Sequence, residues 1–206
     1  MDLKAKVLKH SSIKIEDDVI CYVDPYLIEE ETHDADYILI THPHHDHFSL
    51  KDIQKVAKKD TKYVFPYSMK DQISGVNYVI LLKPYDEFSY KKIKIKALHS
   101  YNNITKEFHP FWEFWLGYRI EINGVSYAVL GDSDYNEDIN KVLCDVLFVP
   151  VGGKYTMDYI EAAQLTNEIK PKIVIPTHYG LITGTKDDGK NFEKLVSKDI
   201  NVIIQI

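Results

Sequence analysis

The sequence of 206 residues predicts an α/β or α+β fold with two β-sheets, and three patterns support this class. Apolar runs bounded by turn residues predict buried strands, as in SYAVL at 126–130, DVLFVPV at 145–151 and KIVIP at 172–176. Apolar residues at helical spacing predict helices interspersed with these strands. A pair of strands is expected to turn at Asn123-Gly124, a strong hairpin signal.

Segment 91–100, KKIKIKALHS, alternates between lysine and apolar residues. Successive side chains of a strand point to opposite faces of the sheet. Ile93, Ile95 and Ala97 therefore share one face with His99, and the alternating lysines share the other. This parity points His99 toward the core.

Two helices are predicted from capping residues and periodicity. Ser49 followed by Asp52 resembles a capping box, and apolar residues then repeat at helical spacing toward Lys59. The second helix is expected over 157–169, with Thr156 as its N-cap. Weaker helical signals lie at two further places, 68–73 and 190–198.

The composition narrows the class of protein. With 45% hydrophobic residues, the chain is long enough for a single domain, 1–206, with a substantial core. Its formal charge is −6 and Arg119 is its only arginine, so we expect no nucleic-acid partner. No apolar run has the length of a membrane span or signal segment, so a cytoplasmic protein without a membrane partner is expected. Cys21 and Cys144 are predicted to be reduced core residues.

Segment 41–48, THPHHDHF, contains four of the nine histidines and follows the predicted strand YILIT. Imidazole and carboxylate together suit zinc, manganese or iron. From an irregular loop, His42 and His44 can reach one ion, and Asp46 and His47 can reach a neighbouring position. One loop cannot complete either coordination sphere, so more distant ligands are needed.

Other acidic and histidine residues also follow predicted strands, namely Asp24, His99, Asp132 and His178. Open α/β sheets bind ligands at the carboxyl ends of their strands, where loops converge without disturbing the core. Five strands would therefore deliver these side chains to one edge of the sheets. Three of the residues, His99, Asp132 and His178, are available to complete a metal site.

This ordered set resembles the metallo-β-lactamase fold superfamily. The resemblance is carried by HPHHDH at 42–47, DP at Asp24, His99, GDSD at 131–134 and THYG at 177–180, and it covers nearly the whole chain. Within the superfamily, VPVGGKYTMDYIEAA and IPTHYG are similar to small metal-dependent hydrolases related to ascorbate-phosphate lactonases.

The resemblance implies a four-layer αββα sandwich with two divalent metal ions at one edge. Zinc is the expected ion, with manganese or iron as alternatives. The implied ligands are His42, His44 and His99 for one ion, Asp46, His47 and His178 for the second, and Asp132 as the bridge. A hydroxide between the ions would be the nucleophile, with catalytic roles for Asp46, Asp132 and His178.

Two histidines compete for the third histidine position. His99 by itself, on an apolar strand face, would be interpreted as a core histidine, and the surrounding pattern favours a ligand. His109, in FHPFW, lies ten positions later and is expected nearer the substrate than the metal. The sequence leaves open which of the two is the ligand.

Other site residues have structural alternatives. Asp132 could cap a turn after Gly131, but without it an oxygen bridge is missing. His178 could be a buried structural histidine, although its place after a strand favours a ligand. His45 occupies a variable position of HxHxDH and is expected to face solvent or support a ligand. His10, in KHSSI, resembles a position of the family to which the sequence assigns no role.

A further set is expected to support the ligands or to contact substrate: Asp24, Tyr101, Asn102, His109, Asp134, Lys154, Tyr155 and Thr156. Asp24 and Asp134 are expected behind the ligands. The segment GGKYTM leads into a helix N-terminus, which attracts anions, and it is equally compatible with a tight turn.

The aromatic stretch 108–115, FHPFWEFW, departs from the family pattern, which usually has small, basic and glycine residues after HP. Core packing or a contact in a homo-oligomer would explain such density. If the stretch overhangs the site, it favours an apolar or sugar-like substrate group over a highly charged one.

The predicted function is a dinuclear metal-dependent hydrolase that acts on a small lactone, ester or phosphoester. A di-iron redox protein is an alternative, but its relatives usually add a flavin-binding domain, and none fits here. A nuclease is opposed by the acidic composition and the single arginine. A non-enzymatic metal-binding relative is the remaining alternative, and tight metal binding without turnover would favour it.

Overall fold

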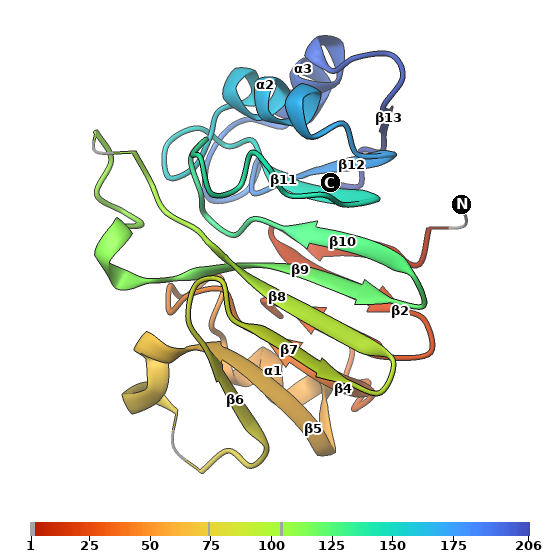
Figure 1. Ribbon diagram of the computed structural model, residues 1–206, viewed down its shortest axis with the longest axis vertical. Helices are drawn as coiled ribbons and strands as arrows, with labels where there is room; N and C mark the ends of the chain where they lie inside the picture. The colour runs from red at the N-terminus through yellow and green to blue at the C-terminus, as the bar shows by residue number, and fades with distance from the viewer. Residues whose placement is uncertain (1–2, 74, 104) are drawn as a thin grey trace.

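The computed structural model describes residues 3–73, 75–103 and 105–206, which form two β-sheets packed face to face (Figure 1). The first sheet contains β1 (Ala5–Lys9), β2 (Ser12–Glu16), β3 (Ile20–Val23), β4 (Ala35–Leu39), β5 (Ala57–Pro66) and β6 (Val79–Leu82). The second contains β7 (Glu87–Tyr90), β8 (Ile93–His99), β9 (Leu116–Ile122), β10 (Val125–Val129), β11 (Val146–Pro150), β12 (Ile173–Thr177) and β13 (Asn201–Val202). Each sheet is therefore built from one continuous half of the chain.

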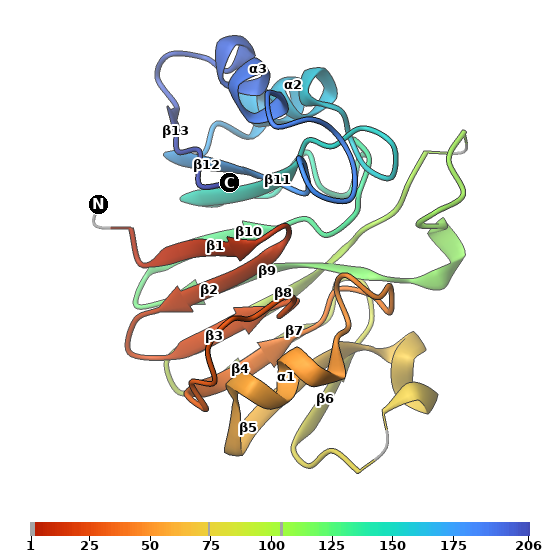
Figure 2. The ribbon, with the colours of Figure 1, turned by 180° about the vertical axis from the view of Figure 1, so that it is seen from behind.

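Helices cover the outer face of each sheet. The helix α1 (Leu50–Val56) packs on the first sheet, while α2 (Tyr159–Ile169) and α3 (Asp188–Leu195) pack on the second (Figure 2). Two 3₁₀ turns complete the elements: η1 (Tyr67–Gln72) contributes Met69 to the apolar cluster beneath α1, and η2 (Phe111–Glu113) lies in the connection between β8 and β9. The predicted four-layer αββα arrangement is confirmed. No helix in the described part of the chain has the length and apolar character needed to cross a membrane.

The main core lies between the sheets and follows the alternation in the sequence. Ile93, Ile95 and Ala97 of β8 are buried in it, as predicted, while the intervening lysines are exposed. Leu98 points the other way, into the apolar layer beneath α2 and α3. Because each fully buried aliphatic side chain contributes about 1.5–3 kcal/mol, this two-sided burial fixes the register of β8.

The predicted hairpin is confirmed between β9 and β10. Ile122 pairs with Val125, and the two turn residues have positive φ values, 50° at Asn123 and 78° at Gly124. Positive φ at both central residues is the requirement of a type I′ turn, which asparagine and glycine satisfy at low cost.

The boundaries of both predicted helices differ from the structure. The first ends at Val56 rather than near Lys59, because β5 begins at Ala57. Its Asp52 carboxylate accepts hydrogen bonds from the backbone N–H groups of Leu27 and Ile28, so it anchors a loop instead of completing a capping box.

The second helix begins at Tyr159, with Asp158 as N-cap in a capping box with Glu161. Thr156 is not the cap, since its hydroxyl donates to the carbonyl of Met157. Met157 is tied outside the helix, because its N–H donates to Ser133 and its carbonyl accepts from Gly153.

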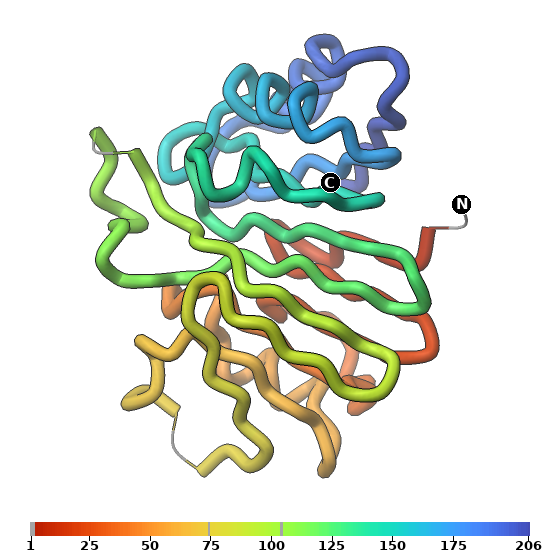
Figure 3. The backbone as a smooth tube through the Cα atoms, viewed as in Figure 1, coloured from red at the N-terminus to blue at the C-terminus, as the bar shows by residue number. Residues whose placement is uncertain are grey.

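Parallel pairing places the carboxyl ends of neighbouring strands, and the loops that follow them, at the same edge of each sheet. The strands β3 to β6 are mutually parallel, and so are β10 to β13. In Figure 1 the arrow of β10 points to the left, toward the side where residues 105–115 project. Figure 3 shows the N-terminus on the opposite side. The loops after the parallel strands therefore meet at one edge, as predicted.

Hydrogen bonds between segments of the two sheets join them at this edge. The buried Tyr118 hydroxyl, from β9, donates to the carbonyl of Ile40 at 2.6 Å. The N–H of Leu116 donates to the carbonyl of Thr41 at 3.0 Å. The second sheet thus holds the segment that leads directly into the histidine cluster.

We predict that Tyr118→Phe lowers the free energy of unfolding by about 1–3 kcal/mol, because the buried carbonyl of Ile40 loses its side-chain donor. Chemical denaturation followed by circular dichroism measures this change. Tyr127→Phe is a matched control, because Tyr127 is buried to the same degree as Tyr118 and belongs to the same core between the sheets. Equal destabilisation by both variants would contradict the prediction.

Candidate metal centre

Asp24, directly after β3, is a buried carboxylate that organises segment 41–48. Its Oδ1 accepts the N–H of Thr41 at 2.8 Å, and its Oδ2 accepts the Thr41 hydroxyl at 2.6 Å. The same Oδ2 lies 2.8 Å from Nδ1 of His47. Because an ionised carboxylate only accepts, Nδ1 of His47 carries a proton toward Asp24, so Nε2 is the nitrogen that faces the donor groups.

The same carboxylate orients His42 through Thr41. The Thr41 hydroxyl donates its proton to Asp24, so it accepts from Nδ1 of His42, which lies 2.9 Å away. This contact leaves Nε2 of His42 free to coordinate a metal. That nitrogen lies 3.0 Å from Nδ1 of His44 and 3.7 Å from Oδ2 of Asp132.

His42, His44 and Asp132 form the first group of donors, each with one donor atom within 4.8 Å of the others. His109 stands beside them, with its ring centroid 4.5 Å from that of His42. Trp115 packs against both histidines, with its ring centroid 5.3 Å from that of His42 and 4.6 Å from that of His109. A fourth donor, and the third that is a histidine nitrogen, is therefore available at this group.

His47, His178 and Asp132 form the second group. Nε2 of His47 lies 3.1 Å from Oδ1 of Asp132, and Nε2 of His178 lies 3.1 Å from Oδ2. Asp132 belongs to both groups, and its two oxygens face different histidines. It follows Gly131 at the carboxyl end of β10, and so lies between loops from both sheets.

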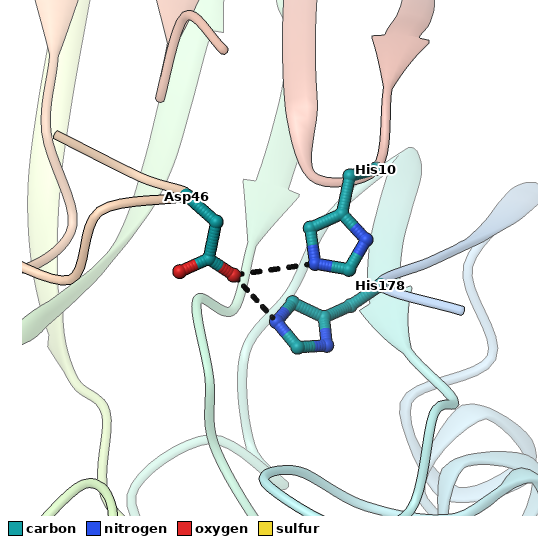
Figure 4. Close-up of side chains that lie close together, drawn as sticks. All are labelled: His10, Asp46 and His178. Carbon is teal, nitrogen blue, oxygen red and sulfur yellow. Dashed lines mark ion pairs between the residues drawn. The ribbon is translucent and has the colours of Figure 1, made fainter. Parts of the chain in front are cut away.

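A third group consists of Asp46, His10 and His178. Figure 4 shows the Asp46 carboxylate facing both histidines, with Oδ2 at 3.3 Å from Nε2 of His10 and 3.6 Å from Nε2 of His178. His10 occupies the β1–β2 turn, and its carbonyl accepts the N–H of His178. Oδ2 of Asp46 also lies 3.6 Å from Nε2 of His47, which joins this group to the second.

The geometry of these donors fits bound cations. The separations of 3.0–3.7 Å within the groups are close to the separation of about 3.4 Å between two ligands of a tetrahedral zinc ion with bonds of about 2.1 Å. Buried donor atoms without a hydrogen-bond partner are found on His10, His47, His109, Asp132 and His178. Protein interiors leave few polar atoms unpaired, so these atoms are expected to have a partner. A bound cation would be such a partner.

Burial sets the charge of the first group. Desolvation lowers the pKa of His42 well below its ordinary value and lowers the pKa of His109 to about 3. It also lowers the pKa of His44. All three imidazoles are therefore neutral at pH 7, which is the form that binds metals.

In the second group, the histidine pKa values are raised rather than lowered. Burial opposes a charge on His47 and His178, but the pKa of both is raised because neighbouring carboxylates together outweigh it: Asp132 at both histidines, with Asp24 at His47 and Asp46 at His178. Burial likewise opposes the charge of Asp132, and the two histidines hold its pKa well below the usual range. A cation that binds here takes the place of these protons, so metal binding is expected to release protons.

His99 does not join the three donor groups. Its Nε2 donates to the carbonyl of Phe111 at 3.0 Å, and its ring packs 4.5 Å from the ring of Phe111 and 4.7 Å from that of Tyr101. Nδ1 faces Asp138 at 3.8 Å. The strand parity is as predicted, but the loop after β8 covers this side chain. The structure brings His109, not His99, to His42.

Several residues expected near the site form its framework. Asn102 is buried, and its amide group contacts the N–H of His109 and the carbonyls of Asp132 and Tyr155. Asp134 is buried and accepts hydrogen bonds from Lys106 at 2.8 Å and from the N–H of Asn103. These contacts support the loops behind the donors. Tyr101 packs on His99, away from the donor groups.

The remaining predicted residues lie at the surface or in the framework. Lys154 is exposed, with its ammonium group 4.7 Å from the centroid of the Tyr155 ring. Thr156 is buried, and its carbonyl accepts a hydrogen bond from Lys106. The His45 side chain is 80% exposed, in agreement with its variable position in the motif.

A pocket of about 220 Å³ opens over the donors. Its lining residues are His44, His45, Asp46, Phe108, Asp132, Tyr155 and Ile182. Phe108 and Ile182 were not singled out by sequence reasoning, apart from the place of Phe108 in the aromatic stretch. His10 was noted without a role, and its burial beside Asp46 is visible only in three dimensions.

Comparisons with known proteins agree with this arrangement. A family model described as beta-lactamase superfamily domain matches residues 4–178. A UPF0173 metal-dependent hydrolase from Staphylococcus carnosus is 30% identical over 196 residues, which cover 85% of this chain and 84% of the relative.

Solved structures are similar in fold. One from Parabacteroides distasonis is 28% identical with a TM-score of 0.84, covering 98% of this chain and 91% of the other. The metallo-β-lactamase fold protein YhfI from Bacillus subtilis, 15% identical, has a TM-score of 0.72 over 96% of this chain and 90% of its own. The chain therefore belongs to the beta-lactamase superfamily and has the metallo-β-lactamase fold.

Proposed function

We propose that this chain is a dinuclear metal-dependent hydrolase that acts on a small lactone, ester or phosphoester. The single observation that carries the proposal is the position of Asp132 in two adjacent donor groups: its Oδ2 lies 3.7 Å from Nε2 of His42 and 3.1 Å from Nε2 of His178. Relatives of similar length named metal-dependent hydrolases support the hydrolase class. Divalent ions at such a site supply an activated water and polarise the carbonyl or phosphoryl group of the substrate.

The proposed ligands follow from the donor groups. We assign His42, His44 and His109 to one ion, Asp46, His47 and His178 to the other, and Asp132 to both. This assignment replaces His99 by His109. The nitrogen and oxygen donors suit zinc, with manganese and iron as alternatives.

Other residues of the chain position these ligands and the substrate. Asp24 fixes the ring orientations of His42 and His47, so their free nitrogens point to the ions. His10, which does not line the pocket, lies 3.3 Å from the Asp46 carboxylate and holds it in place. The pocket admits a small-molecule substrate to the exposed side of Asp46, His44 and Asp132.

We expect Asp132→Ala to reduce bound metal from about two ions per chain to one or none and to abolish hydrolysis. Elemental analysis by plasma mass spectrometry and a panel of lactones, esters and phosphodiesters measure both effects. Asp138→Ala, outside the donor groups, is the control and should keep both properties. Unchanged hydrolysis by Asp132→Ala with its fold intact would refute the proposed function. Full metal binding by the unaltered protein without turnover of any substrate would favour a non-enzymatic metal protein.

A pair of matched variants tests the third histidine. His109→Gln should reduce bound metal by about one ion per chain, because it removes a donor beside His42. His99→Gln should retain the full amount, since an amide can still donate to the carbonyl of Phe111. Elemental analysis compares the two proteins. The reverse result would assign the ligand role to His99.

The carboxylate behind the ligands can be tested without removing a ligand. Asp24→Asn removes an acceptor that orients His47 and, through Thr41, His42. We expect metal affinity to fall about 10–100-fold while the fold is retained. Competition with a chromophoric chelator gives the affinity, and circular dichroism checks the fold. Unaltered affinity would show that Asp24 does not position the ligands.

A further inference from the structure

The pocket over the donor groups has two chemically different sides. His44, His45, Asp46 and Asp132 form the polar side, and all of them except His45 are proposed metal ligands. Facing the same space are Phe108, Tyr155 and Ile182, which we call the apolar wall. A molecule that fills the pocket therefore contacts both sides.

The apolar wall is a preformed surface. The rings of Phe108 and Tyr155 meet edge to face, with their centroids 4.7 Å apart. Phe108 is 44% exposed and Ile182 is 36% exposed, so both retain apolar surface that a ligand can cover. The carbonyl of Tyr155 accepts a hydrogen bond from the buried Asn102 at 2.9 Å, which holds this residue in place.

The charges around the pocket do not favour an anionic group. In the part of the chain that the structure describes, no lysine or arginine lines the pocket. Lys106, behind it, is already paired with Asp134 at 2.8 Å. Lys154 lies against the ring of Tyr155 and is exposed. A phosphate on the distal part of a substrate would therefore meet no lining side-chain cation.

We propose that the apolar wall binds an aromatic or branched aliphatic group of an uncharged ester or lactone whose carbonyl lies over Asp46 and Asp132. This inference rests on the proposed function and narrows its substrate class. The size is suitable, since the pocket measures about 220 Å³ and an apolar cavity of about 150 Å³ holds benzene. An edge-to-face aromatic pair is also a suitable surface for a third ring.

Steady-state kinetics with phenyl acetate, methyl acetate and phenyl phosphate test the proposal. Phe108→Ala and Tyr155→Ala should each raise KM for phenyl acetate by roughly tenfold, and that for methyl acetate by less than about twofold, because a methyl group covers little of the wall. Trp112→Ala, at a residue that is 68% exposed and does not line the pocket, is the control. The unaltered enzyme should prefer phenyl acetate to phenyl phosphate in kcat/KM.

A binding measurement separates this proposal from the proposed function. Benzyl alcohol is added to the protein as purified, and saturation-transfer NMR detects its contacts. The signal should be strong for the unaltered protein and for Trp112→Ala, and weak for Phe108→Ala and Tyr155→Ala, with metal content unchanged in all four.

The outcomes are distinguishable. Binding that depends on Phe108 and Tyr155, without hydrolysis of any ester, would refute the hydrolase function and support the apolar wall as a binding surface. Hydrolysis with equal KM values in all variants, or a preference for phenyl phosphate, would overturn the apolar-wall proposal and leave the hydrolase function standing.

Discussion

The buried carboxylate of Asp24 is the constraint on which the proposed metal centre depends. It accepts hydrogen bonds from the backbone and hydroxyl of Thr41 and from His47, so a single group fixes the start of the histidine loop and the tautomers of two rings. A buried carboxylate is costly unless its oxygens are paired, and here the pairing partners are the supports of the site. The hydrogen bonds that compensate for the burial of Asp24 are therefore the same ones that orient the proposed ligands His42 and His47.

Sequence patterns predicted the layers and most of the site, because strand parity and strand ends are local properties. The alternation in β8 predicted which of its residues face the core, and the loops after β4, β10 and β12 led directly to the donor groups. The choice between His99 and His109 is not local. It depends on the loop after β8, which folds back over this strand. The carbonyl of Phe111 in η2 accepts a hydrogen bond from the His99 ring there. The role of Asn102 in holding His109 is likewise a tertiary contact.

The predicted N-cap of the second helix was also wrong because it depends on a tertiary contact. Thr156 and Asp158 are both good N-caps by residue type, and the backbone contacts of Met157 with Ser133 and Gly153 keep Met157 outside the helix. The proposed ligands and the apolar wall lie on the same connections: Phe108 directly precedes His109, and Ile182 follows His178 in the loop after β12. The geometry of the pocket and that of the donor groups are therefore set by the same loops.

Each sheet is made from one continuous half of the chain, and this arrangement has a consequence for biosynthesis. The donors of the first half, from His10 to His47, leave the ribosome before Asp132 and His178 have been made. An ion that meets the nascent chain therefore finds an incomplete coordination sphere. Full affinity develops only when the second sheet packs on the first, so tight metal uptake is a late event that reports completed folding.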